Sequence, residues 1–499
     1  MTIPFTKFDG VYIGNEWVTA ADTDPVINPA TEEVIGLAPV ATVAQADQAI
    51  AAARDAFDKG SWPRMSRKER AAVMQRMLDA LIARKAQIRA LLIAEIGCAQ
   101  YMIDLVQIGA CLEHFQKTID HSLNDDSYHL PIEAAPNPVN PDAPRTLGSA
   151  IVVREPIGVV SAITAYNFPF FLCLSKIVPA LLTGNTMVLK PSPFTPFSAL
   201  LFGEVANEIG LPRGVLNIVT GGGDVGGLIT TDDRVDMVTF TGSEGVGSAI
   251  MQQAAKTLKR VHLELGGKSA MIVRSDANIM AAAQAAVGSI SVNAGQGCAL
   301  MTRFLVHNDI RAAFAATCAA VAPHFKVGNP ADPSVLMGPL IRDTQRARVE
   351  SLVASGVASG AELIVGGGRT AGLDKGYFHD ITIFDNVDNK SEIAQEEVFG
   401  PVGVIIGFDT DEEAIDIAND SRFGLSGSIM SADAATAFDI AGRIRTGSMH
   451  INGGMGKMAY GPLGGYKRSG LGREFGPEWL KEYTQEKSIY YPVGYPKAV

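Results

Sequence analysis

The chain has 499 residues, of which 47% are hydrophobic and 19% charged, and its formal net charge is −11 at pH 7. This length exceeds one compact core and predicts roughly two to four globular domains, at about 150 residues each. The acidic balance argues against nucleic acid and against a membrane surface as partners, because both are anionic and attract a basic protein.

The N-terminal segment has no basic start followed by an apolar run, so we expect no signal peptide. No apolar run reaches the roughly 18 residues that a membrane span requires. The five cysteines have no CxxC spacing, which excludes a zinc ribbon and predicts a reducing, cytoplasmic location. By default each is expected to be a small buried apolar residue: Cys98, Cys111, Cys173, Cys298 and Cys318.

Helix signals come first along the chain. The capping boxes TVAQ (42–45) and SRKE (66–69) start two predicted helices, which end near Gly60 and Gly97. Five prolines interrupt the segment 129–144 and predict an extended excursion instead of a helix.

An alternation of β-rich and helix-like runs follows. Near-continuous apolar strands joined by crossover helices predict an α/β fold with a parallel sheet covered on both faces. Ligands bind such sheets at the carboxyl ends of the strands. The expected strands of the first block are 157–164, 185–192, 214–220 and 235–242, with a helix over 196–210; a second block begins near 268, and a last strand covers 486–493.

Cys298 lies in the stretch NAGQGCALM, after a helix-like run over 277–293. The C-terminal end of a helix is negative and disfavours a thiolate. A reactive Cys298 therefore needs an activator such as a base, a cation or backbone N–H groups. Taken alone, the stretch fits an inert buried cysteine as well as a nucleophile.

Two further polar residues stand at predicted strand ends. Glu264, in LELGGKS, is either a general base or a surface carboxylate. Asn167, in TAYNFPFF, either donates to an oxyanion or stabilises a turn. Gly242 and Ser243 lie between a strand and a helix start, which is a typical anion site.

Taken together, the motifs resemble the aldehyde dehydrogenase superfamily over nearly the whole chain. LELGGKS matches its glutamate motif and GQGC its cysteine motif. Further family motifs occur along the chain in the expected order: YIGNEWV, NFP, LKPS and FTGS before these two, and EEVFGPV and GPLGGYKRSGLGREFG after them. The resemblance implies a Rossmann-like cofactor domain (1–128 and 149–264), a second α/β catalytic domain (265–480) and a small β oligomerisation arm (129–148 and 481–499). The arm implies a homo-oligomer, a dimer or tetramer, because a strand edge outside its own domain is best paired by a partner.

The resemblance also implies catalytic roles. Cys298 attacks the aldehyde carbon, while the Asn167 amide and the Cys298 N–H hold the oxyanion. Glu264 activates the water that hydrolyses the thioester, and its presence argues for a free carboxylic acid product. Lys176 and Glu474 match two polar positions near the site, as a proton path or a structural support.

The implied cofactor is NAD, with NADP as the alternative. NAD-preferring relatives carry a glutamate that bonds the adenosine ribose where this chain has Pro193, so a 2′-phosphate would not be repelled. Tyr166 stands where most members have tryptophan. The implied cofactor residues are Tyr166, Lys190, Ser192, Gly221, Gly242, Ser243, Leu265, Glu397 and Phe399.

The implied substrate tunnel is mostly small or apolar and has no arginine to clamp a distal carboxylate, which favours a bulky apolar or aromatic aldehyde. Lys457 leaves open an anionic semialdehyde as the substrate. The residues also leave open a cysteine hydrolase that uses no nucleotide and a catalytically silent scaffold. The implied tunnel residues are Phe168, Leu172, Ser175, Gly297, Ala299, Met455, Lys457 and Leu463.

Overall fold

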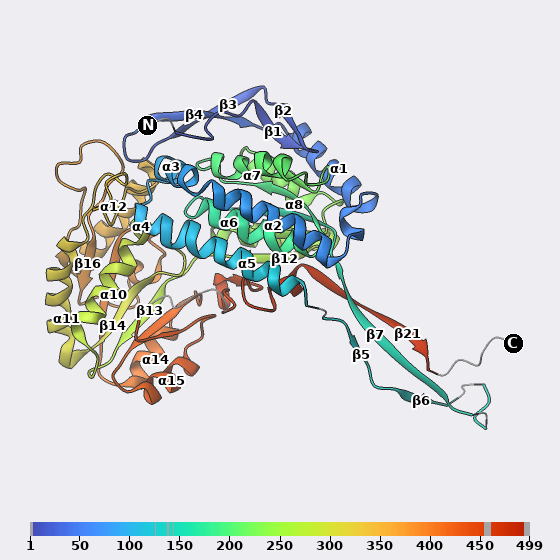
Figure 1. Ribbon diagram of the computed structural model, residues 1–499. Helices are drawn as coiled ribbons and strands as arrows, with labels where there is room; N and C mark the ends of the chain where they lie inside the picture. The colour runs from blue at the N-terminus through green and yellow to red at the C-terminus, as the bar shows by residue number, and fades with distance from the viewer. Residues whose placement is uncertain (1–2, 125, 137–138, 143, 454–460, 494–499) are drawn as a thin grey trace.

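Two bodies, each built around a sheet, and a narrow β arm make up the molecule (Figure 1). The computed structural model describes residues 3–124, 126–136, 139–142, 144–453 and 461–493. The mixed α/β architecture with parallel sheets confirms the predicted fold class. None of the helices in these ranges has the length and apolar character needed to cross a lipid bilayer.

The first sheet has a parallel centre. Strands β10, β9, β8, β11 and β12 are parallel, while β1 pairs antiparallel with β10 and with the edge strand β2, and β20 pairs antiparallel with β12. The order reverses between β8 and β11, which is where ligands bind in open α/β sheets. In the described chain the order is β2 (Glu16–Thr19), β1 (Gly10–Ile13), β10 (Leu216–Ile218), β9 (Thr186–Lys190), β8 (Val159–Ile163), β11 (Met237–Thr241), β12 (Arg260–Glu264) and β20 (Gly470–Leu471).

Helices cover both faces of this sheet, because its strands are apolar on both sides. One face packs on α1 (Val43–Asp58), α8 (Gly223–Thr231) and α9 (Glu244–Ala254). The other packs on α2 (Arg67–Ala83), α3 (Lys85–Ile96), α5 (Cys111–Ser122), α6 (Pro169–Leu182) and α7 (Phe197–Glu208). Between α3 and α5 the chain forms α4 (Gln100–Met102) and a π-helix (Ile103–Ala110).

Both predicted capping boxes are present, but the second predicted helix is two helices. The break is at Arg84, whose φ of −100° and ψ of 8° leave the helical region. The Arg84 guanidinium donates to the Ala80 carbonyl at 2.9 Å and pairs with Glu208 at the end of α7. The helical spacing of apolar residues, on which the prediction rested, contains no information about such a tertiary contact. The predicted end at Gly97 is correct, and this glycine has a left-handed φ of 67°.

The second sheet is parallel except for its edge strand β15. Helices α10 (Ile279–Ser291), α11 (Asn308–Val321), α12 (Asp343–Ala358) and α13 (Glu392–Gln395) pack with α14 (Asp411–Asn419) and α15 (Ala434–Arg443) around it. In the described chain the order is β15 (Glu362–Val365), β16 (Thr382–Asp385), β17 (Val402–Phe408), β14 (Met301–His307), β13 (Ser269–Val273), β18 (Gly427–Met430) and β19 (His450–Ile451).

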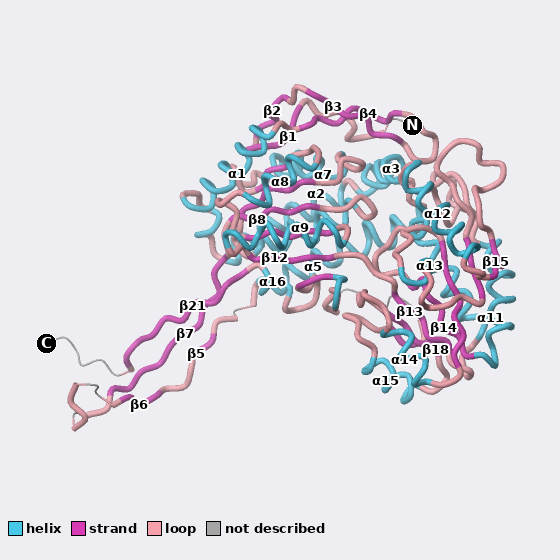
Figure 2. The backbone as a smooth tube through the Cα atoms, turned by 180° about the vertical axis from the view of Figure 1, so that it is seen from behind, coloured by secondary structure: helices cyan, strands magenta, loops and turns pink. Residues whose placement is uncertain are grey.

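The arm projects away from both bodies in two opposite views (Figures 1 and 2). Its long strands β7 (Thr146–Pro156) and β21 (Thr484–Pro492) pair antiparallel along their length, and α16 (Trp479–Glu482) precedes β21. The proline-rich stretch adds the short strands β5 (Tyr128–His129) and β6 (Glu133–Ala135) to β7. A separate hairpin, β3 (Asp22–Ile27) and β4 (Val34–Val40), lies near the N-terminus.

Candidate active site

Cys298 lies in a loop that joins α10 to β14. The helix ends at Ser291, and the turn after it contains Asn293 and Ala294 with left-handed φ angles of 47° and 54°. Such angles are uncommon for residues other than glycine and concentrate at functional sites. Of the five cysteines, Cys298 alone is partly exposed, so the default expectation of burial is wrong for it and correct for the other four.

The Asn167 side chain lies beside this loop. It comes just before α6, and its Nδ2 donates to the Gln296 carbonyl at 3.0 Å. The Asn293 amide donates back to the Asn167 carbonyl at 2.9 Å. Gln296 is held in turn, because its Oε1 accepts from the Ile341 N–H at 3.0 Å. Gln296 and Asn293 are not among the predicted site residues; their amides in NAGQG are the signal that the sequence offers for them.

Glu264 ends β12, and the two glycines after it bring its motif against the cysteine. A Cβ placed on Gly267 would lie 2.3 Å from the Cys298 carbonyl oxygen, so only glycine permits this contact. The Gly267 N–H also donates to Glu397 Oε1 at 2.9 Å. Three segments that are distant in the sequence therefore meet at one point.

Burial and negative charge set the proton affinities at this point. Burial, and then the charge of Glu474, hold the pKa of the Glu264 carboxyl well above its ordinary value. Burial, and then the charges of Glu264 and Glu397, raise the pKa of the Cys298 thiol to about 12. The carboxyl thus has the proton affinity of a base, and the thiol is protonated at neutral pH.

Lys176, on α6, and Glu474, in the segment between β20 and α16, form a buried ion pair. Ser175 Oγ donates to Glu474 Oε1 at 3.4 Å, and the Glu474 backbone exchanges two hydrogen bonds of 2.7 Å with Leu463. The charges of Lys176 and Glu474 both act on the pKa of Glu264. The structure therefore places this ion pair close enough to Glu264 for both of its charges to act on the pKa of the candidate base.

Most of the residues predicted to bind cofactor lie at the carboxyl ends of the parallel strands of the first sheet, whereas Glu397 and Phe399 lie in the loop before β17. Lys190 is the last residue of β9, Gly242 follows β11, and Ser243 precedes the first residue of α9. Near the cysteine loop, the Tyr166 ring lies 5.9 Å from the Phe399 ring. Gly221 and Ser192 lie in the loops after β10 and β9. Leu265 follows β12, and Glu397 contacts the same loop through its hydrogen bond from the Gly267 N–H.

These groups fit a dinucleotide. Lys190 is buried, its Nζ donates to the Pro191 carbonyl at 3.2 Å, and burial lowers its pKa to about 8. Among the described residues, the buried hydroxyls of Tyr166 and Thr241 have no hydrogen-bond partner. Buried polar groups are rarely left unpaired, so hydroxyl and phosphate groups of a ligand would satisfy them.

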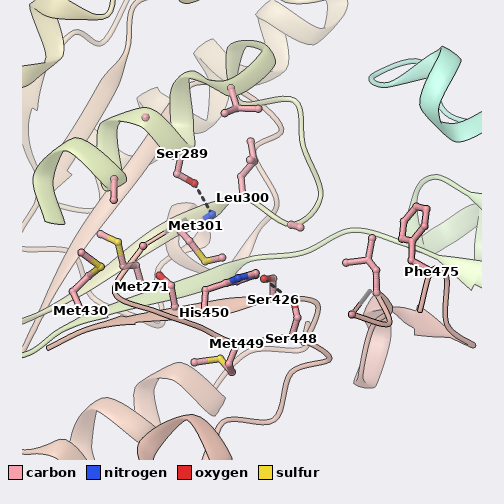
Figure 3. Close-up of a pocket in the computed structure, with 18 of the residues that line it drawn as sticks. Met271, Ser289, Leu300, Met301, Ser426, Met430, Ser448, Met449, His450 and Phe475 are labelled. Atoms are coloured by element: carbon pink, nitrogen blue, oxygen red, sulfur yellow. Dashed lines mark hydrogen bonds between the residues drawn. The ribbon is translucent and has the colours of Figure 1, made fainter. Parts of the chain in front are cut away.

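A cavity of about 620 Å³ opens beside the cysteine loop (Figure 3). Of the predicted tunnel residues, Ala299 and Leu463 line it. Phe168 and Leu172 lie at the start of α6, Ser175 contacts Glu474, and Gly297 packs against Leu300. Met455 and Lys457 lie outside the described residues. Lining residues that were not predicted include Met271, Leu300, Met301, Met430, Met449 and Phe475.

The fold and site define a class: an α/β enzyme with a dinucleotide-type sheet and a cysteine held beside an amide and a buried carboxyl. The sequence profile of the aldehyde dehydrogenase family matches residues 17–489. The chain therefore belongs to the aldehyde dehydrogenase family, which confirms the resemblance seen in its motifs.

Solved structures show the same likeness. An aldehyde dehydrogenase of Mycobacterium tuberculosis complexed with NAD+ is 43% identical, with a TM-score of 0.91 and coverage of 98% of this chain and 99% of that one. A cysteine-to-alanine mutant of aldehyde dehydrogenase C of Pseudomonas syringae, complexed with NAD+ and octanal, is 36% identical, with a TM-score of 0.91 and 98% of both chains covered. A betaine aldehyde dehydrogenase of Staphylococcus aureus, also with NAD+, is 34% identical, with a TM-score of 0.92 and 98% and 96% covered.

Proposed function

We propose that the chain oxidises a bulky apolar or aromatic aldehyde to the free carboxylic acid with NAD+, through a thioester on Cys298. The contact between the Gly267 loop and the Cys298 carbonyl carries this proposal, because it brings the motif of Glu264 to the cysteine. Glu264 is what distinguishes hydrolysis to an acid from transfer of the acyl group to another acceptor.

In the first half of the reaction the partly exposed Cys298 thiol loses its proton to solvent, its sulfur bonds to the aldehyde carbon, and the carbonyl π bond opens to an oxyanion. One Nδ2 proton of Asn167 is used on the Gln296 carbonyl, and the second is free for the oxyanion together with the Cys298 N–H. Preorganised donors of this kind are worth about 3–4 kcal/mol each. NAD+ would supply hydride acceptance, and Lys190, Ser243, Glu397 and their neighbours would hold it.

In the second half, Glu264 removes a proton from the attacking water, and the Cys298–carbon bond breaks to release the acid. Its raised pKa strengthens it as a base, since the carboxylate then has a larger affinity for the water proton. Lys176 and Glu474 stand behind it, where they can take up the proton or hold its carboxyl in place.

The cavity supports an apolar substrate. Methionine, leucine and phenylalanine side chains line it, and its described lining contains no lysine or arginine. Ser289 and Ser448 are engaged within the protein, since Ser289 Oγ accepts from the Met301 N–H at 2.8 Å and Ser448 Oγ donates to Ser426 Oγ at 3.0 Å. The Pseudomonas syringae relative with octanal points in the same direction, whereas the betaine aldehyde relative points to a charged substrate.

A substrate panel tests the proposal. Initial rates with benzaldehyde, decanal, a terpenoid aldehyde, betaine aldehyde and succinic semialdehyde would be measured with NAD+ and with NADP+. We expect the highest kcat/KM for an apolar or aromatic aldehyde, and NADH only when aldehyde and NAD+ are both present. A preference for succinic semialdehyde would favour the anionic alternative, and ester hydrolysis without any aldehyde oxidation would favour the cysteine hydrolase.

NAD+ is our proposed cofactor, and Pro193 is the position that tests its selectivity. A glutamate there would repel a 2′-phosphate, so Pro193→Glu should raise the KM for NADP+ far more than the KM for NAD+. Pro193→Gln is the matched control, because glutamine has nearly the size and shape of glutamate without its charge.

We also propose that the protein is a homo-oligomer assembled through the arm. Large apolar side chains of the arm are exposed, among them Ile132 at 61%, Ile489 at 47% and Tyr490 at 78%. Exposed apolar surface on a β edge is typical of a surface that pairs with another chain. A monomeric mass by light scattering at micromolar concentration would contradict this proposal.

A further inference from the structure

His262 lies on the same face of β12 as Glu264. Side chains alternate along a strand, so residues two apart share a face, about 6.6 Å apart along the chain. Leu263, between them, packs in the cluster formed with α1, α8 and α9. His262 and Glu264 therefore face the opposite layer, that of α6, which carries Lys176.

The imidazole of His262 is fixed from two sides. Its Nδ1 lies 3.1 Å from Thr239 Oγ1, and Tyr483 Oη donates to that oxygen at 3.5 Å. The Thr239 proton is then free to be donated to Nδ1, which places the ring proton on Nε2. The ring edge that carries Cδ2 and Nε2 packs against Gly472, where a Cβ would lie 2.1 Å from His262 Cδ2 and 3.0 Å from His262 Nε2.

Two buried polar atoms of this face are unpaired. Within the part of the chain that the structure describes, neither His262 Nε2 nor Glu264 Oε1 has a hydrogen-bond partner. His262 is 1% exposed and Glu264 is 4% exposed. Leaving a buried donor and a buried acceptor unpaired is costly, and a single buried water between them would pair both.

We propose that His262 is a positioning residue for the hydrolytic step: its Nε2–H, through one bridging water, holds the otherwise unpaired oxygen of Glu264. This leaves the second carboxyl oxygen to take the proton of the attacking water. The inference rests on the proposed function, because it assigns a role in thioester hydrolysis.

The charges around the ring suit a neutral donor. Burial, and then the positive charges of Lys176 and Arg473, hold the pKa of His262 well below its ordinary value. The ring consequently stays uncharged over the working pH range and keeps one N–H. Glu474 and Tyr483 are the further titratable groups of this layer.

Two amide substitutions distinguish the roles of the two ring nitrogens. The side-chain amide of glutamine reaches the position of Nε2, whereas that of asparagine reaches only the position of Nδ1. The steady-state kcat would be measured with an aldehyde that the wild-type protein oxidises. The fraction of chains acylated on Cys298 would be measured by mass spectrometry of acid-quenched samples. We expect His262→Asn to lower kcat about tenfold and to raise the acylated fraction, and His262→Gln to restore most of both. Thr239→Val, which frees the ring from its orienting hydroxyl, should act in the same direction.

Ser161→Ala is the matched control, because Ser161 Oγ is also buried and unpaired in the described chain but lies on β8. It should change neither quantity. An unchanged kcat in His262→Asn, a fall in kcat without more acyl-enzyme, or a glutamine variant no better than asparagine would overturn the role of His262 alone. A wild-type protein that forms no acyl-enzyme with any aldehyde and NAD+ would instead overturn the proposed function.

Discussion

The Asn167 side-chain amide donates a hydrogen bond to the backbone carbonyl of Gln296 at 3.0 Å, two residues before Cys298. This bond joins the start of α6, on the first sheet, to the loop that carries the cysteine on the second body. It leaves one amide proton of Asn167 free and places the amide beside the nucleophile. The same side chain is thus a structural tether and the proposed oxyanion donor.

Asn167→Leu separates the two roles of Asn167, because it removes both N–H donors, keeps about the same side-chain size and adds no charge beside Cys298. We expect kcat/KM for aldehyde oxidation to fall by about 100- to 1,000-fold, the usual effect of losing one oxyanion donor. The rate of Cys298 alkylation by iodoacetamide serves as the control for the loop. If alkylation fell as much as kcat/KM, loss of loop geometry would explain the result and the donor role would be wrong.

Glu264→Gln removes the proposed base and keeps the volume. We expect steady-state acid production to fall by at least about 100-fold, because positioned general bases contribute rate factors of that size. NADH should still form in a single turnover, and the acyl group should remain on Cys298 when the protein is weighed by mass spectrometry. Glu33→Gln, on an exposed carboxyl, is the control. Equal loss of the single turnover and of steady-state rate would contradict the assignment.

The pKa of Cys298, raised to about 12, predicts its reactivity without cofactor. A raised thiol pKa means less thiolate at every pH below that value, so the alkylation rate at pH 8 should be low. The rate should then climb about tenfold per pH unit to at least pH 10, without the plateau of an ordinary thiol. Cys298→Ser controls for the other cysteines, which are buried. A plateau near pH 8 would refute the prediction.

Glu95 predicts a pH dependence of stability away from the site. It is fully buried and accepts from the Phe197 N–H at 2.7 Å at the start of α7, and burial raises its pKa from 4.5 to about 7. The folded state therefore binds more protons than the unfolded state in this interval. Its stabilising contribution is complete below about pH 4.5 and is lost as pH rises through about 7, by about 3 kcal/mol.

Glu95→Gln should remove most of this dependence, because an amide cannot ionise. Unfolding free energies from urea titrations at pH 5 and pH 8 provide the measurement. We expect the difference between the two pH values to be smaller in Glu95→Gln than in the wild type. Glu33→Gln, on an exposed carboxyl, should behave as the wild type does. An unchanged difference in Glu95→Gln would exclude Glu95 as its source.

Tyr490→Asp tests the arm. The side chain is 78% exposed on β21, so a charge there costs the free subunit little and opposes burial in an interface. We expect a smaller mass by sedimentation, or dissociation at a higher concentration than in the wild type. Val357→Asp, at a residue that is 53% exposed on α12, is the control. Equal masses for both variants and the wild type would argue against assembly through this strand.

Local signals in the sequence predicted the elements well, because they depend on neighbouring residues. The capping boxes at Thr42 and Ser66 stabilise the helix starts they predict, and the apolar runs form the parallel strands. The positions of Glu264 and Lys190 at strand ends followed from the same patterns. The ordered motifs then identified the family, since their order along the chain is itself sequence information.

Tertiary structure decided what depends on residues far apart in the chain. The predicted helix breaks at Arg84, which pairs with the distant Glu208, and Cys298 differs from four similar cysteines only in what surrounds it. The shared face of His262 and Glu264 was implicit in strand alternation, but only the packed structure shows that His262 Nε2 and Glu264 Oε1 are buried and unpaired among the described residues. Burial and hydrogen-bond partners are properties of the packed chain, and no local pattern contains them.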